Sequence, residues 1–147
     1  MNARRLLLLI ATPLAIASLA APAAAAVINV VKTASCGCCG KWVEHMRKAG
    51  HDVRVTNVED VTPTARRLGV PDDLRSCHTS SVGGYAIEGH VPAADIARLL
   101  REKPKAAGLS VPGMVAGSPG MEMGSNKPPY QTIIFTRDGK RKLFAQH

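Results

Sequence analysis

Three cysteines lie within four consecutive positions, and they are the residues of this chain best suited to do chemistry. The run Cys36, Gly37, Cys38, Cys39 contains a Cys-x-x-Cys pair, which is typical of redox chemistry, and a Cys-x-Cys pair, which can clamp a metal ion. The run stands where a predicted strand gives way to a predicted helix. Free amide groups and the helix dipole stabilise thiolates at such a position. Stabilised thiolates would favour both redox chemistry and metal binding.

The fourth cysteine, Cys77, is followed directly by His78, and His90 follows a short predicted strand. Each has a plainer interpretation, since a lone cysteine is often a small buried hydrophobic residue and a lone histidine an ordinary polar one. Polar residues on both sides of Cys77 favour a loop and a functional thiol. His78 is the stronger candidate because it adjoins a cysteine, whereas His90 only follows the end of a strand.

Three methionines occupy a long stretch rich in Gly, Pro and Ser, without helical spacing. They could fill gaps in the core or form an apolar surface for a partner, but thioethers are also metal ligands. Thiolates together with thioethers select copper(I), whereas zinc takes cysteine and histidine but seldom methionine. We therefore predict a copper(I) site, with zinc less favoured. The candidate metal ligands are Cys36, Cys38, Cys39, Cys77, His78, His90, Met114, Met121 and Met123.

Two structural disulfides would be the usual interpretation of four cysteines in an exported protein, but their spacing argues against it. At most one of the three clustered cysteines can reach Cys77. The remaining pair would then close a loop of one turn, which restricts the unfolded chain very little. His45 and His51 are interpreted as surface residues, and Trp42 and Met46 as core, because helical spacing accounts for them.

The N-terminus has the features of a cleavable secretory signal. Arg4 and Arg5 precede an apolar run that is shorter than the roughly 20 residues of a membrane-spanning helix, and small residues end it at Ala26. Cleavage there leaves 147 − 26 = 121 residues, 27–147, which suits one domain with no stable membrane insertion. The twin arginine alone does not distinguish between export routes.

The charge does not indicate a nucleic-acid partner. The net charge falls from +8 to +6 when the two signal arginines are removed, the basic residues are scattered, and aromatic residues are only 3% of the chain. We interpret the charge as a source of solubility with weak attraction to anionic surfaces.

The order of elements predicts a small α/β fold of thioredoxin-like type, a short mixed sheet flanked by helices on both faces. Residues 27–32 and 52–58 are predicted strands around a helix at 38–49, a unit that is normally parallel and right-handed. Residues 104–129 are predicted as a long loop, which suggests function or disorder. Further helices are predicted at 62–69 and 92–100, a strand at 85–88, and a hairpin from strands 130–136 and 142–144.

Several motifs together resemble a known family. They are SCGCCGKW at 35–42, SCHT at 76–79, VGGYAIEGHVPA at 82–93, and VPGM at 111–114 followed by GSPGME at 117–122. In this order they resemble the exported CopG-like copper-resistance proteins, formerly grouped as a domain of unknown function, over residues 27–144.

The resemblance implies a periplasmic thioredoxin-like protein in which the cysteine cluster and the Cys-His pair meet to bind copper ions. It makes the four cysteines ligands, with Met114 and either His78 or His90 beside them. Thioredoxins that exchange disulfides place a cis-proline opposite the Cys-x-x-Cys, and here residues 82–84 are predicted at that place. Their lack of proline disfavours disulfide exchange.

The leading hypothesis is a metal-binding protein rather than an enzyme, which sequesters copper(I) or hands it on, with copper redox cycling as an activity that the site would permit. The alternative is a thiol-disulfide oxidoreductase that uses Cys36 as nucleophile and Cys39 as resolving thiol. A third hypothesis is a module whose methionine loop docks onto another periplasmic copper protein.

Overall fold

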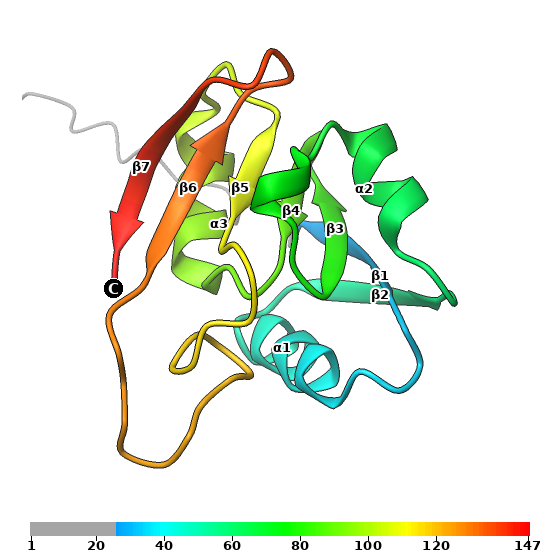
Figure 1. Ribbon diagram of the computed structural model, residues 1–147, viewed down its shortest axis with the longest axis vertical. Coiled ribbons are helices and arrows are strands. Elements are labelled where there is room, and N and C mark those ends of the chain that lie inside the picture. The colour runs from blue at the N-terminus through cyan, green and yellow to red at the C-terminus, as the bar shows by residue number, and fades with distance from the viewer. Residues whose placement is uncertain (1–25) are drawn as a thin grey trace, which may run out of the picture.

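Both strands and helices form along residues 26–147, the part of the chain that the computed structural model describes (Figure 1). The predicted signal peptide lies outside the described residues except for Ala26. No helix within 26–147 combines the length and apolar character needed to cross a bilayer. The elements are β1 (Val27–Lys32), α1 (Gly37–Lys48), β2 (Asp52–Asn57), α2 (Thr62–Leu68), the 3-10 helix η1 (Asp72–Leu74), β3 (His78–Val82), β4 (Tyr85–Glu88), α3 (Ala93–Glu102), β5 (Gly108–Ser110), β6 (Gln131–Phe135) and β7 (Arg141–Gln146).

All the strands join one seven-stranded mixed sheet in the order β2-β1-β3-β4-β5-β6-β7. The predicted strand, helix, strand unit is present, because β1 and β2 pair in parallel with α1 between them. Strand β3 runs antiparallel to both β1 and β4, and β5 is parallel to β4. The predicted C-terminal hairpin is β6 and β7.

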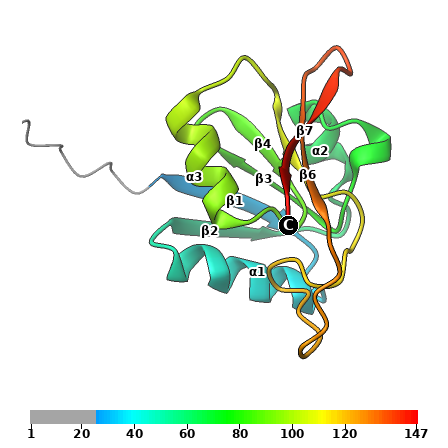
Figure 2. The same cartoon turned by 90° about the vertical axis from the view of Figure 1, so that its left-hand side faces the viewer.

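The two faces of the sheet bury different sets of side chains, because successive residues of a strand point to opposite faces. Ile87 of β4 packs with α1 and α3 in the larger core, whereas its neighbour Ala86 packs with α2 in the smaller one. Helices α3 and α2 accordingly lie on opposite sides of the sheet (Figure 2). The mixed α/β class with helices on both faces is as predicted, and the narrower thioredoxin-like assignment stays a prediction.

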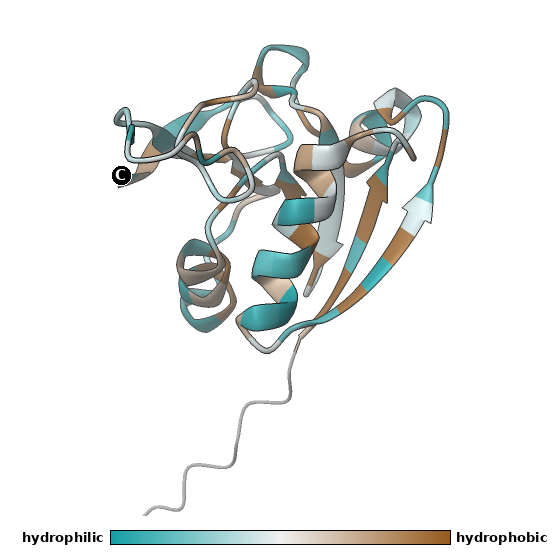
Figure 3. Ribbon diagram, turned by 90° about the horizontal axis from the view of Figure 1, so that it is seen from below, coloured by the Kyte–Doolittle hydropathy of each residue, from teal (hydrophilic) through white to brown (hydrophobic). Residues whose placement is uncertain are grey.

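Helix α1 is amphipathic and carries the cysteine cluster at its start. Its buried residues Cys39, Trp42, Val43 and Met46 follow the helical spacing of one face, and the outward side of the helix is mostly hydrophilic (Figure 3). Trp42 and Met46 are fully buried, as predicted for core residues. The helix therefore holds its N-terminal turn rigidly against the sheet.

Two strands were not predicted from the sequence. The segment from His78 to Val82 has no apolar run or alternation, yet it forms β3 between β1 and β4, with four of its five residues buried. The three-residue strand β5 lies inside the predicted 104–129 loop. Both form because neighbouring strands supply their hydrogen bonds, a tertiary effect that overrides local preference.

Substituting Gly108 with alanine should destabilise the fold, because a Cβ there would lie 2.0 Å from the carbonyl oxygen of Ala86 on β4. We expect a loss of about 3 kcal/mol of unfolding free energy, measured by urea denaturation. The matched control is Gly40→Ala in α1, where a Cβ would meet nothing within 4 Å. That change should stabilise the protein by roughly 0.5–1 kcal/mol. Equal midpoints for the two variants would contradict the packing described.

Candidate metal centre

The cysteine cluster occupies the turn from β1 into α1. Cys36 caps the helix without a side-chain capping bond, and its N–H donates to the Thr33 carbonyl oxygen at 3.2 Å. Cys38 and Cys39 follow in the first helical turn, where Cys38 is half-buried and Cys39 is fully buried. The thiols therefore lie beside the free amide groups of a helix start, an environment that favours thiolates.

The register of β1 with β3 brings the distant cysteine to this turn. Lys32 pairs with His78, so the residues just after β1 and just before β3 meet at one edge of the sheet. The Sγ of Cys77 lies 3.4 Å from that of Cys39 and 4.0 Å from that of Cys38. Cys38 Sγ is in turn 3.4 Å from Cys36 Sγ. The convergence of the Cys-His pair on the cluster is thus confirmed.

Both candidate histidines border the same thiol. His90 Nε2 lies 3.1 Å and His78 Nδ1 3.6 Å from Cys77 Sγ, and both side chains are fully buried. The antiparallel β3–β4 pairing explains this, because it places His78 against Gly89, whose N–H donates to the His78 carbonyl at 3.0 Å. Trp42 supports the pair, with its ring 4.6 Å from that of His78.

Burial keeps these groups neutral in the absence of a metal. Burial raises the pKa of Cys77 to about 12, and the neighbouring Cys38 adds to the effect. Burial, and after it the proximity of His90, lowers the pKa of His78 to about 3. Burial also lowers the pKa of His90. A neutral imidazole is the form that binds a metal ion, whereas the thiol must release its proton to do so.

Two groups of donor atoms are close enough to hold a metal ion, within residues 26–147. One is the four cysteines and the other is Cys77, His78 and His90, with the ligand atoms of each group within 4.8 Å of one another. Cys36 and Cys39 form a disulfide in this structure, and Cys38 and Cys77 are free thiols. Reduction of that bond would make all four sulfurs available. The cluster is therefore capable of metal binding, with thiol and imidazole donors that suit a soft ion.

The methionines lie on the segment between β5 and β6, which passes close to the cluster. Ser76, next to Cys77, donates its hydroxyl hydrogen bond to the carbonyl of Gly113, one residue before Met114. The side chains of Met114 and Met123 are 57% and 66% exposed, and Met121 is half-buried. Their role as ligands stays a prediction. His45, predicted as a surface residue, is exposed, and His51 is half-buried.

A buried carboxylate that the sequence analysis did not single out supports the cysteine turn. Glu88 at the end of β4 is fully buried and accepts hydrogen bonds from the Ser76 N–H at 2.8 Å and the Thr79 hydroxyl at 2.6 Å. Arg75 Nε lies 3.5 Å from the same carboxylate, and burial raises the Glu88 pKa. The sequence does carry a signal for Glu88, because a glutamate ends an otherwise apolar strand there.

One prediction about the site is wrong. The residue opposite the Cys-x-x-Cys is Cys77, directly before β3, whereas residues 82–84 lie at the other end of β3, in its turn to β4. A Cβ at Gly83 would contact Leu100 of α3, which places that turn on the helix rather than on the cluster. The reason is that the sequence does not reveal β3. The prediction therefore placed the segment after β3 opposite the cysteines, instead of the segment before it.

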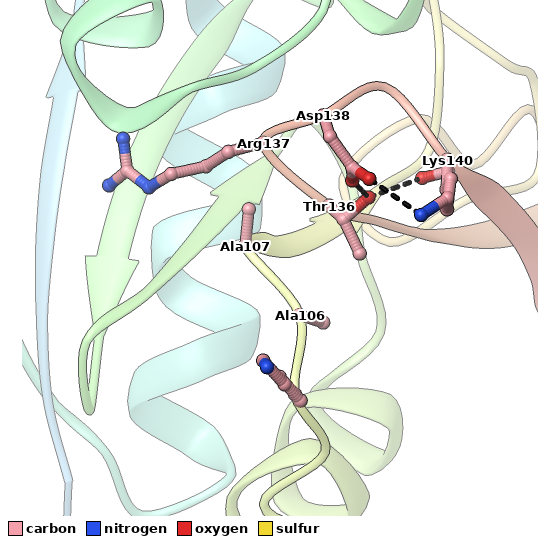
Figure 4. A pocket seen from close by; sticks show the side chains of 7 residues that line it. Ala106, Ala107, Thr136, Arg137, Asp138 and Lys140 are labelled. Atoms are coloured by element: carbon pink, nitrogen blue, oxygen red, sulfur yellow. Dashed lines mark hydrogen bonds and ion pairs between the residues drawn. The ribbon is translucent and has the colours of Figure 1, made fainter.

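A surface cavity lies away from the cysteines, at the β6–β7 turn. It measures about 570 Å³ and is lined by Lys105, Ala106, Ala107, Thr136, Arg137, Asp138 and Lys140 (Figure 4). Asp138 already bonds Lys140 at 2.8 Å and the Thr136 hydroxyl. Since no thiol or imidazole lines it, this cavity does not provide an alternative soft-metal site.

Comparisons with known proteins agree with this geometry. Two solved structures are similar over most of the chain. "Copper resistance protein copG- Form 2" is 42% identical with a TM-score of 0.80, covering 84% of this chain and 98% of that one. "Copper resistance protein copG- Form 1" is 44% identical with a TM-score of 0.78, covering 82% and 96%. This chain belongs to the CopG copper-resistance family.

The other comparisons add one match. Residues 74–121 match the family described as "Protein of unknown function, DUF411". This range includes Cys77, His78, His90, Met114 and Met121. The search of curated proteins found no match.

Alkylation with iodoacetamide should distinguish the two kinds of cysteine in this family member. Without reductant we expect modification at Cys38 and Cys77 only, and after reduction at all four cysteines, as read by peptide mass spectrometry. At neutral pH Cys77 should react slowly, because the thiolate is the nucleophile and the pKa of this thiol is raised to about 12. Its rate should therefore rise as the pH increases. Modification of Cys36 before reduction, or a Cys77 rate independent of pH, would contradict the structure.

Proposed function

We propose that this protein is an exported copper(I)-binding protein of copper homeostasis and resistance, which sequesters copper or transfers it to another protein. The observation that carries the proposal is the position of Cys77, whose Sγ lies 3.4 Å from Cys39 Sγ and 3.1 Å from His90 Nε2. Sulfur atoms from two distant segments and an imidazole thus lie together in a largely buried position. Soft sulfur donors with imidazole suit copper(I).

The charge and burial of the donors are compatible with a monovalent ion. The imidazoles of His78 and His90 are held neutral by burial, and each thiol that binds contributes one negative charge after losing its proton. A buried ion is tolerated when the site offsets its charge. A monovalent ion needs fewer thiolates for this than a divalent ion needs. Zinc is the less favoured metal because it seldom takes methionine, which the neighbouring loop carries, and because the named relatives are copper resistance proteins.

Export to the periplasm is part of the proposal. The predicted cleavage after Ala26 would leave β1, which begins at Val27, complete. Residues 27–147 would then be the mature thioredoxin-like copper-binding domain. Copper ions are the proposed cargo, another periplasmic copper protein is the proposed partner, and Met114, Met121 and Met123 are proposed as additional thioether ligands.

Titration of the reduced protein with copper(I) against a competing chelator tests the proposal. Cys36→Ser or Cys39→Ser should weaken binding by more than the roughly 10–100-fold that loss of an outer-shell partner costs, because a ligand itself is removed. Ser35→Ala, an exposed change next to Cys36, is the control and should leave affinity unchanged. Binding no tighter than that of the fully alkylated protein would sink the proposal.

The disulfide between Cys36 and Cys39 favours a second candidate, a thiol-disulfide oxidoreductase. In that mechanism Cys36 would attack a substrate disulfide and Cys39 would resolve the mixed disulfide. Cys38 has no role in it, although its Sγ lies within 4.0 Å of Cys77 Sγ in the proposed copper site.

Cys38→Ser separates the two functions. If the cluster is a copper site, the Cys38→Ser variant should bind copper(I) more weakly than the wild type. Without metal, neither protein should catalyse the reduction of a disulfide substrate by a dithiol. Metal-free turnover that survives Cys38→Ser and is lost in Cys36→Ser would establish the oxidoreductase instead.

A further inference from the structure

His90 is held by a backbone carbonyl of the methionine-bearing loop. Its Nδ1 lies 2.8 Å from the carbonyl oxygen of Pro119. A carbonyl can only accept, so Nδ1 carries the proton and donates. In the neutral ring the other nitrogen, Nε2, is then an acceptor, and it is the one 3.1 Å from Cys77 Sγ. The carbonyl thus selects the tautomer whose lone pair points to the thiol.

The loop that carries this carbonyl rests directly on α1. Gly120 follows Pro119, and a Cβ at Gly120 would lie 2.7 Å from the Trp42 amide nitrogen and 2.8 Å from the Cys38 carbonyl oxygen. Its φ of +87° is also one that L side chains rarely adopt. Loop backbone and helix backbone therefore meet within one residue of the carbonyl that orients His90.

The Glu122 carboxylate links that loop to a side chain of the helix. Both oxygens of Glu122 lie 3.0 Å from the Gly120 N–H, and Oε1 also lies 2.8 Å from Nε2 of His45 on α1. The turn itself is internally bonded, since the Met121 N–H donates to the Ser118 carbonyl at 2.8 Å and the Gly117 N–H to the Met121 carbonyl at 2.9 Å. The turn is therefore held together by its own hydrogen bonds, and the carboxylate attaches it to the surface of the helix.

We propose that Glu122 and His45 are positioning residues of the copper site: by fastening the 117–122 turn to α1 they keep the Pro119 carbonyl on His90 and so hold His90 Nε2 toward Cys77. This inference rests on the proposed copper function for its purpose, but its geometry concerns the metal-free protein. The two side chains are 44% and 43% exposed, so their pairing adds little to global stability. Its effect is local, as expected of a partner that orients a ligand from outside the ligand sphere.

The first test measures the ring tautomer of His90 by ¹⁵N NMR in metal-free protein. The wild type should show the Nδ1-protonated form alone. Glu122→Ala and His45→Ala should show both tautomers, with an unchanged urea midpoint. His45→Gln, whose amide can still donate to Glu122, should restore the single tautomer. Glu44→Ala, an exposed change on the same helix, is the matched control and should match the wild type.

The second test measures the rate at which copper(I) passes from the protein to an excess of chelator. We expect Glu122→Ala and His45→Ala to release the ion at least about 10-fold faster, and Glu44→Ala and His45→Gln at the wild-type rate. Gly120→Ala, which pushes the turn off the helix by another route, should reproduce the faster release.

Two results would overturn the inference: an Nε2-protonated ring in the wild type, or a wild-type tautomer in both Glu122→Ala and His45→Ala. If Glu122→Ala does not fold, His45→Ala decides the matter. Should the wild type bind no copper(I), the proposed function fails, and the tautomer measurement still supports or overturns the positioning role independently.

Discussion

The antiparallel pairing of β1 with β3 is the contact on which the site depends. It sets Lys32 opposite His78, so that the turn after β1 and the turn before β3 share one edge of the sheet. Because side chains alternate between faces along a strand, a slip of one residue would turn His78 to the other face of the sheet and move it away from Trp42 and His90. Neighbouring strands on both sides of β3 prevent such a slip.

The assembled site consists of polar side chains packed among apolar ones, and its chemistry follows from that environment. His78 and His90 are buried as completely as the core residues Trp42 and Ile87. Within the described chain His78 Nε2 has no hydrogen-bond partner, a costly condition for a buried polar atom. Stability alone does not account for two imidazoles and a thiol in this position, whereas the proposed ion binding would.

The disulfide connects the two functional hypotheses through the same atoms. With Cys36 and Cys39 joined, Cys38 and Cys77 are the thiols that remain, and reduction returns a group of four. Oxidation and metal binding therefore compete for the same sulfurs. The methionine-bearing loop approaches α1 so closely that position 120 requires a residue without a side chain, which is Gly120.

Much of this could be inferred from residue types alone. Local patterns predict the cysteine cluster at a strand-to-helix junction and the amphipathic α1 with Trp42 and Met46 inside. They also predict the parallel β1–β2 unit and the C-terminal hairpin. Soft donors likewise indicate a soft ion, because ligand chemistry belongs to the side chain rather than to its position.

What local pattern could not supply was β3. Its sequence HTSSV is polar, and it is a strand only because β1 and β4 bond it from both sides. The same pairing decided that Cys77, rather than residues 82–84, faces the cluster and that Glu88 lies buried beneath Ser76, whereas the packing of the β5–β6 loop on α1 decided that the Pro119 carbonyl meets His90. The sequence therefore determined which atoms could bind an ion, and the tertiary structure determined which of them meet, because distances between remote segments depend on strand register and loop placement.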